Sequence, residues 1–252
     1  MSFAFTSSLL NQSPLCACAI TGVIRDKQTA KIEIFFIIAI ITLFKNNVFK
    51  ESIMAMGVEV SVRKDGYFAG KLLLAMPGML DPRFENAVIF LCSHDAQGAM
   101  GLVINNQLPG MQFEHLLDEL DMRSDILVDP TILQMPLMNG GPVDTGRGFL
   151  LHGSDFHHKE TIAIDESIAI SGTLDALKEI ARGKGPQDKL IMFGYAGWSA
   201  RQLDEEIQAN SWLVSDPDPA LIFKTNHSAK WQAAVETLGV DPALLVADGG
   251  QA

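Results

Sequence analysis

Apolar residues in this chain gather in short runs, and the two most regular runs predict a pair of buried strands. Ala87–Cys92 and Ala99–Ile104 are each about the length of a strand, contain no charged residue and together are rich in Val, Ile, Leu and Phe. Runs of this kind are typical of strands that are covered on both faces of a sheet. A short polar link containing His94 and Gly98 joins them, so we expect neighbouring strands at the centre of the fold.

Other short apolar stretches predict further strands on either side of this pair. Some are continuous and others alternate apolar with small residues, and turn-forming residues bound most of them. The expected strands, the first with its lead-in, are Phe68–Leu74, Gly146–Leu151, Thr161–Ile164, Ser167–Ser171 and Leu190–Phe193. Asp129–Pro136 shows neither pattern and is expected to be an irregular connection.

Helices are predicted where apolar residues recur at spacings of three and four. The expected helices are Gln112–Met122, Leu174–Ala181, one that opens at Ser199 and one that follows Ser228. Ser199 and Gln202 have capping-box spacing, in which each side chain bonds the other residue's backbone N–H. Because strands and helices alternate without a regular βαβ rhythm, the chain is predicted to be a mixed α+β fold.

Charge and composition set the first 55 residues apart from the rest. They carry five Lys/Arg against three Asp/Glu, and since the whole chain carries −11, the residues after Ala55 carry −13. The apolar segment Ile34–Phe44 is shorter than the roughly 20 residues that a membrane span needs, and its position suits a secretory signal poorly. We therefore expect residues 1–55 to be a non-native or disordered extension, with a single-pass anchor as the alternative. Residues 56–252 are expected to form one domain without a membrane span.

The composition of this domain argues against several classes of function. An acidic domain repels phosphate backbones and shows no basic patch, so direct nucleic-acid binding is not expected. Cys16 and Cys18 lie in the extension, which leaves Cys92 alone in the domain. No internal disulfide is therefore expected, and a reducing cytoplasm suits the protein. We also expect no cofactor and no metal.

Four long motifs occur in the same order as in the AlgH/YqgE family of bacterial proteins, which this chain closely resembles. They are Met76–Asn105, Asn139–His152, Gly194–Leu213 and Leu221–Thr225, and the likeness runs from about Lys71 to the C-terminus. The resemblance implies a branched mixed β-sheet, partly closed into a small barrel and surrounded by helices. It implies no particular reaction. One branch of the family is named for an effect on alginate regulation. If this protein influences transcription, as that name suggests, we expect the effect to be indirect.

Cys92 and His94 are the candidates for catalysis. Residues two apart on a strand point to the same face, and a thiolate beside an imidazole is the core of a nucleophile or of a metal site, with His152 as a third ligand. The competing interpretation treats Cys92 as a buried small hydrophobe, because it closes an apolar run. The family commonly has a glutamate between the Cys and the His, where this chain has Ser93. We expect Cys92 to be structural.

The glycine-rich segment Gly194–Trp198 is a candidate for binding. It is expected to leave a strand and enter a helix, the position at which phosphate-binding loops occur. Its spacing matches no nucleotide-binding motif, however, and three acidic residues follow in the first two turns of the expected helix. We therefore favour a packing role, in which the glycines let the backbone pass close to Trp198.

Arg147 is the second candidate for binding, together with the turn that precedes it at Asn139, Gly140 and Gly141. It is the only basic residue between Asn139 and His152. Because buried arginines are almost always paired, we expect Arg147 to reach an internal carboxylate or backbone carbonyls. The alternative is that its guanidinium binds an anionic ligand or partner.

The sequence therefore favours a cytoplasmic, non-enzymatic accessory protein that binds a protein partner or a small ligand. The alternative is an enzyme or redox-sensing protein that uses Cys92 with His94. Direct DNA binding is the least favoured function because of the acidic domain.

Overall fold

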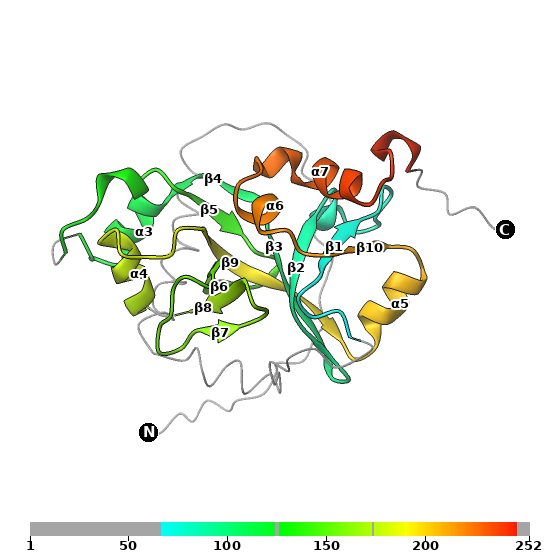
Figure 1. Ribbon diagram of the computed structural model, residues 1–252, viewed down its shortest axis with the longest axis horizontal. Helices are drawn as coiled ribbons and strands as arrows, with labels where there is room; N and C mark the ends of the chain where they lie inside the picture. The colour runs from blue at the N-terminus through cyan, green and yellow to red at the C-terminus, as the bar shows by residue number, and fades with distance from the viewer. Residues whose placement is uncertain (1–66, 124–125, 173, 246–252) are drawn as a thin grey trace, which may run out of the picture.

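The computed structural model describes residues 67–123, 126–172 and 174–245, which form an α+β fold (Figure 1). Residues 1–55, which are predicted to be a non-native or disordered extension, lie outside the described residues. The strands are β1 (Leu72–Ala75), β2 (Val88–Asp95), β3 (Gly98–Val103), β4 (Gln107–Gln112), β5 (Pro136–Asn139), β6 (Val143–Gly153), β7 (Ile162–Ala163), β8 (Ile168–Ser171), β9 (Lys189–Ser199) and β10 (Trp212–Ser215). The helices are α3 (Phe113–Glu119), α4 (Leu174–Ala181), α5 (Gln202–Gln208), α6 (Pro219–Phe223) and α7 (Lys230–Thr237). Within these residues no helix has the length and apolar character needed to cross a membrane.

The strands form one curled sheet that branches at β9. Its main path is β10-β1-β2-β3-β9-β6-β8-β7, with antiparallel neighbours throughout. The first half of β9 also pairs in parallel with β5, which in turn pairs with β4. The sheet is therefore mixed and branched, and it curls into a half-barrel, which confirms the predicted fold. In Figure 1, β9 runs diagonally through the middle of the molecule and connects its two ends.

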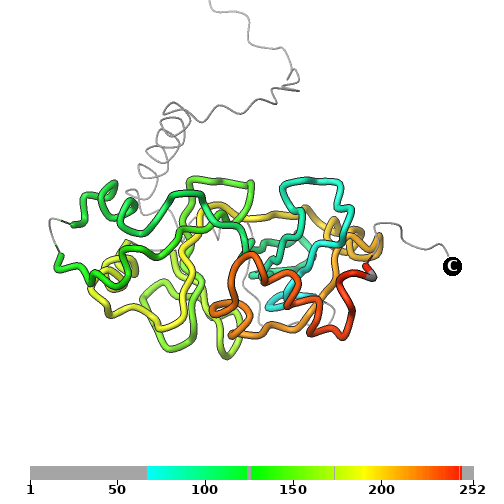
Figure 2. The backbone as a smooth tube through the Cα atoms, turned by 90° about the horizontal axis from the view of Figure 1, so that it is seen from above, coloured from blue at the N-terminus to red at the C-terminus, as the bar shows by residue number. Residues whose placement is uncertain are grey.

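Helices cover the sheet in separate places, and each covers its own part of the core. The segment carrying α6 and α7 lies against β1 and β2 (Figures 1 and 2), where Leu221 and Val235 join a cluster around Phe90 and Phe149. At the other end of the molecule, α3 and α4 pack on a second cluster that includes Phe113. A third cluster lies against α5 and contains both Trp198 and Trp212.

The central pair of strands has the burial that its apolar pattern predicts. Seven consecutive residues of β2, Val88–His94, are buried. Alternate side chains enter different clusters, since Phe90 packs with the cluster under α7 and Ile89 with the cluster under α5. The prediction that these strands are covered on both faces is confirmed.

The prediction that Gly194–Trp198 leaves the sheet is wrong. These residues belong to β9, and Ala196–Ser199 pairs with Gly98–Gly101 of β3. A glycine-rich sequence is typical of a loop, but here the glycines allow two backbone segments to pass close to each other. A Cβ atom added to Gly140 would lie 2.3 Å from the Gly194 carbonyl oxygen. The long-range pairing partner, rather than local propensity, keeps this segment extended.

The expected capping box at Ser199 forms only in half. Helix α5 begins at Gln202, after Arg201 in the left-handed region at φ 66°. The Ser199 N–H and hydroxyl both donate to Gln202 Oε1 at 3.0 Å, so the Ser199 hydroxyl does not cap a helix N–H. Ser199 is the last residue of β9 rather than the cap of the helix.

Candidate functional site

A β-bulge separates Cys92 from His94. In the β2–β3 ladder Leu91 pairs with Gly101 and Ser93 with Met100, so Cys92 is the extra residue. Cys92 joins the cluster under α7, as does Met100, whereas His94 lies opposite Ala99 and near α5. The expectation that the two side chains share a face is wrong, because a bulge shifts the alternation of side chains by one residue.

Cys92 lies in surroundings that suppress thiol reactivity. Its side chain is buried, with 4% of its surface exposed, and burial raises the pKa of the thiol to about 12. The sulfur is 3.7 Å from the Phe90 carbonyl oxygen, to which the S–H donates. Since the thiolate is the reactive form, burial disfavours reaction of the Cys92 thiol at neutral pH.

We expect Cys92 in the folded protein to resist alkylation by iodoacetamide at neutral pH and to react once the chain is unfolded in guanidinium. Mass spectrometry of the peptide that contains Cys92 measures both rates. Cys92→Ala is expected to lower the free energy of unfolding by about 1 kcal/mol or more, because it leaves a small cavity. Rapid labelling of Cys92 in the native protein would contradict the structural role.

His94 fastens the chain that precedes β1 onto β2. Its Nδ1 accepts the Phe68 backbone N–H at 3.1 Å, and the Phe68 ring stacks on the imidazole at 5.7 Å. Its Nε2 lies 3.6 Å from Asp204 Oδ1 of α5. Burial lowers the pKa of His94, while the charge of Asp204 opposes this shift. Because Nδ1 already accepts a hydrogen bond from the Phe68 backbone N–H, the imidazole is poorly placed to act as a general base.

His152 belongs to a separate buried hydrogen-bonded chain beside β8. Its Nδ1 lies 2.7 Å from the Gly153 carbonyl oxygen and its Nε2 lies 2.9 Å from Ser171 Oγ. A carbonyl can only accept, so Nδ1 carries the proton, and since burial lowers the pKa of His152, Nε2 accepts from Ser171. Thr161 then donates to Ser171 at 2.8 Å and accepts the His158 N–H at 2.9 Å. Every side chain in this series of hydrogen bonds has a partner, which is typical of a structural network.

Cys92, His94 and His152 therefore occupy three different environments. Cys92 faces the cluster under α7, His94 faces α5, and His152 contacts Phe156 beside the cluster under α3 and α4. In the part of the chain that the structure describes, no group of three or more His, Cys, Asp or Glu residues is arranged to hold a metal ion.

Glycines of the motifs Asn139–His152 and Gly194–Leu213 lie where the backbone after β5 passes close to β9. The Gly140 N–H donates to the Phe193 carbonyl at 2.7 Å, and Asn139 Oδ1 accepts the Gly141 N–H at 3.1 Å. A Cβ atom on Gly141 would lie 2.2 Å from the Tyr195 carbonyl carbon, and one on Gly194 would lie 2.3 Å from the Gly141 carbonyl oxygen. Because the opposing backbone fills this space, none remains for a phosphate.

Trp198 is held by a carboxylate that sequence reasoning assigned only to the charged start of a helix. Glu206 Oε2 accepts the indole N–H of Trp198 at 2.9 Å and that of Trp212 at 2.7 Å. Its other oxygen accepts from the Gln202 amide at 2.9 Å. Glu206 thereby joins α5 to both β9 and β10, and no local sequence signal marks it because these contacts cross between three different elements.

Arg147 lies beside one carboxylate of its own strand. Its Nε is 3.6 Å from Asp144 Oδ2, and its side chain is 14% exposed. Burial raises the pKa of the neighbouring Tyr195, and the charge of Arg147 opposes that shift. The contact is within the protein, as the structural interpretation expects, but at this distance an ion pair contributes little, about 0–1 kcal/mol.

The loop between β1 and β2 presents the most exposed large apolar side chain among the described residues. Leu80 has 99% of its surface exposed. Beside it lies a hollow of about 370 Å³. The residues that line this hollow are Met76, Pro77, Gly78, Met79, Pro82, Glu85 and Asn86. In the sequence, Pro77, Gly78 and Pro82 indicate only turns, so no local pattern marks this surface.

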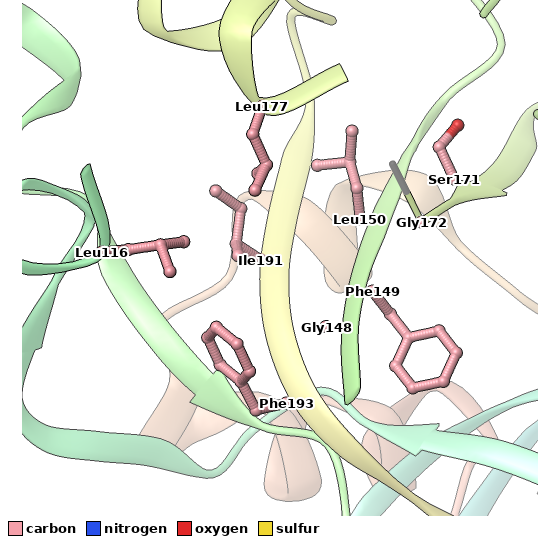
Figure 3. Close-up of a pocket in the computed structure, with 9 residues that line it drawn as sticks. All are labelled: Leu116, Gly148, Phe149, Leu150, Ser171, Gly172, Leu177, Ile191 and Phe193. Carbon is pink, nitrogen blue, oxygen red and sulfur yellow. The ribbon is translucent and has the colours of Figure 1, made fainter. Parts of the chain in front are cut away.

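A second hollow, between the sheet and the helices α3 and α4, is too small for a ligand. Leu116, Leu150, Leu177, Ile191 and Phe193 point toward one another around it (Figure 3). Its volume is about 10 Å³, whereas pockets for small molecules measure roughly 300–1,000 Å³. It is a packing defect of the core.

Comparison with known proteins agrees with this fold and its motifs. A UPF0301 protein of Rhodospirillum rubrum is 45% identical over 190 residues, which cover 75% of this chain and 97% of that relative. The solved structure of the AlgH protein from Pseudomonas aeruginosa matches with a TM-score of 0.60 at 40% identity, covering 76% of this chain and all of that one. A Corynebacterium diphtheriae protein shares the fold, with a TM-score of 0.54 at 17% identity over 70% of this chain and 90% of its own. A family model described as AlgH-like matches residues 72–243, so this chain belongs to the AlgH-like family.

Proposed function

We propose that this AlgH-like protein is a cytoplasmic, non-enzymatic accessory protein that binds a protein partner through the loop from Met76 to Asn86. The observation that carries the proposal is the exposed Leu80 in a loop whose other residues line a hollow of about 370 Å³. Concave surfaces are the usual places of recognition, and an exposed apolar side chain in the same loop adds area that a partner can bury. Any effect on transcription is then indirect, because the acidic domain is poorly suited to DNA.

The loop is held in one conformation before any partner arrives. The Met76 N–H donates to the Ser211 carbonyl at 3.0 Å, and the Met79 N–H donates to the Met76 carbonyl at 3.1 Å. At the far end, the Phe84 ring packs against Trp212 with centroids 5.8 Å apart. A surface that is already ordered loses less conformational entropy on binding, which supports a role in recognition.

The competing enzymatic function has less support from the geometry. It requires a thiolate near an imidazole, whereas Cys92 and His94 lie on opposite sides of the bulge and burial raises the pKa of the Cys92 thiol to about 12. The series of hydrogen bonds that contains His152 ends at both sides on backbone groups, the Gly153 carbonyl and the His158 N–H.

We expect Leu80→Asp to abolish the capture of specific partners from the native cell while leaving the fold intact. Leu127→Asp is the matched control, because Leu127 is 93% exposed but lies outside the loop from Met76 to Asn86. Affinity capture followed by mass spectrometry compares wild type and both variants, and thermal melts confirm that each remains folded. Equal capture by Leu80→Asp and wild type would refute the proposal.

A further inference from the structure

We infer that the hollow beside Leu80 receives a basic, apolar segment of the partner protein, with one apolar side chain in the hollow and a lysine or arginine against Glu85. This inference rests on the proposed function and specifies the chemistry of the partner. Two features carry it: the methionine and proline side chains in the wall of the hollow and, among its lining residues, the carboxylate of Glu85, which is unpaired within the described part of the chain.

Apolar and polar atoms share the wall of the hollow about equally. Its apolar part comes from Met76, Pro77, Met79 and Pro82, all of the same loop. Leu80 belongs to this loop too and is almost completely exposed, although it does not line the hollow. An apolar side chain that enters the hollow would contact methionine and proline carbons, while Leu80 would contact a neighbouring residue of the same segment. Methionine adapts its shape to different partners, so the wall suits a leucine, a phenylalanine or a similar side chain.

The charge of the loop is concentrated on one carboxylate. Asp81 is neutralised by Arg83, whose Nε and Nη2 donate to Asp81 at 2.9 Å and 2.6 Å. The Glu85 carboxylate, which lines the hollow, has no hydrogen bond or ion pair within residues 67–123, 126–172 and 174–245. The loop thus offers a single negative charge at the hollow, and a cation is its natural complement.

The charge of the whole domain selects between two possible occupants. The residues after Ala55 carry −13, so a second copy of this chain would bring an equally acidic surface to the contact. Like-charged surfaces repel and associate slowly, whereas a basic segment is steered toward the site. The observations therefore favour a basic segment of another protein over a homodimer.

The test is a selection of peptides from a random displayed library on the full chain at low salt. Selected peptides are then synthesised and their affinities measured by fluorescence anisotropy. We expect them to carry Lys or Arg near a large apolar residue. Leu80→Asp should weaken their binding about tenfold or more, while Leu127→Asp should leave it unchanged. Glu85→Lys should weaken it several-fold and reduce its dependence on salt, and replacing the peptide's basic residue with Glu should restore binding to this variant.

Several results would overturn the inference. These are selection of acidic peptides, binding that neither Leu80→Asp nor Glu85→Lys changes, and failure to select any peptide. A concentration-dependent dimer in sedimentation that Leu80→Asp dissolves would assign the surface to a second copy. If partners captured from the native cell are lost with Leu80→Asp but kept with Glu85→Lys, the proposed function stands and the basic character of the occupant is wrong.

Discussion

Gly141→Ala is expected to destabilise the protein by about 3 kcal/mol or more, the largest loss that we expect from a single methyl group. The added Cβ atom would lie 2.2 Å from the Tyr195 carbonyl carbon and 2.5 Å from the Ala196 nitrogen. These are backbone atoms of β9, which is held by β3 and β6, so they cannot move aside cheaply. Gly141 also has φ 149°, which side chains rarely tolerate. Urea unfolding measures the change in free energy.

Gly110→Ala is the matched control for this substitution. Gly110 also has a positive φ, 70°, but nothing lies within 4 Å of the position that its Cβ atom would take. It should therefore show only the conformational cost, about 1 kcal/mol. If Gly141→Ala were no more destabilising than Gly110→Ala, the close crossing of Gly141 with β9 would not exist in solution.

Lys230→Met is expected to stabilise the protein at neutral pH, by roughly 1–2 kcal/mol. The Lys230 side chain is fully buried, and Nζ donates to the Ile104 carbonyl at 2.9 Å. No carboxylate within the described residues forms an ion pair with it, and burial lowers its pKa from 10.5 to about 8. Methionine has similar length and no charge to desolvate, although it gives up the hydrogen bond to Ile104.

The effect of Lys230 should depend on pH in a direction that follows from its lowered pKa. Between about pH 8 and pH 10.5 the unfolded chain binds more protons at this lysine than the folded chain does. The contribution of Lys230 to stability therefore rises with pH across this window, and below pH 8 its cost is complete, about 3 kcal/mol.

Urea unfolding of wild type and Lys230→Met at pH 7 and near pH 10 tests this expectation. The advantage of the variant should shrink at the higher pH. Lys224→Met serves as the control, because the Lys224 side chain is 62% exposed and should matter little at either pH. Two results would contradict this expectation: a Lys230→Met variant that is less stable than wild type at pH 7, or a stability difference that is the same at both pH values. Either would show that the folded state compensates the cost of burying the Lys230 charge.

Lys230 also shows where local pattern reading stops. Spacings of three and four predict an apolar stripe of Trp231, Ala234, Val235 and Leu238 on the last helix. Ala234 and Val235 are buried as this pattern predicts, but Leu238 is 38% exposed and Lys230 is buried instead. The carbonyl that accepts from Lys230 belongs to Ile104, the residue directly after β3. Helical periodicity cannot reveal a partner that lies more than a hundred residues away.

By itself, the sequence determined the elements whose signal is local. The apolar runs of β2 and β3 and the helix Leu174–Ala181 could be predicted, because burial on both faces leaves a continuous apolar run and helical amphipathicity leaves a periodic one. The polar strand Gln107–Gln112 and the short strand Trp212–Ser215 leave no such trace, and pairing with distant strands makes them extended.

Only the tertiary structure decided the arrangement of the side chains that carry chemistry. The bulge at Cys92 moves His94 to the other face of the sheet, Glu206 joins two tryptophans, and β3 keeps Ala196–Ser199 in a strand. The exposure of Leu80 beside its hollow depends on how the whole loop packs. The bulge, the Glu206 contacts and the pairing of β3 with β9 each join different elements of the fold. The local sequence shows how apolar a position is. The register of a strand, the face on which each side chain lies and its contact partners depend on which other backbone lies beside the strand.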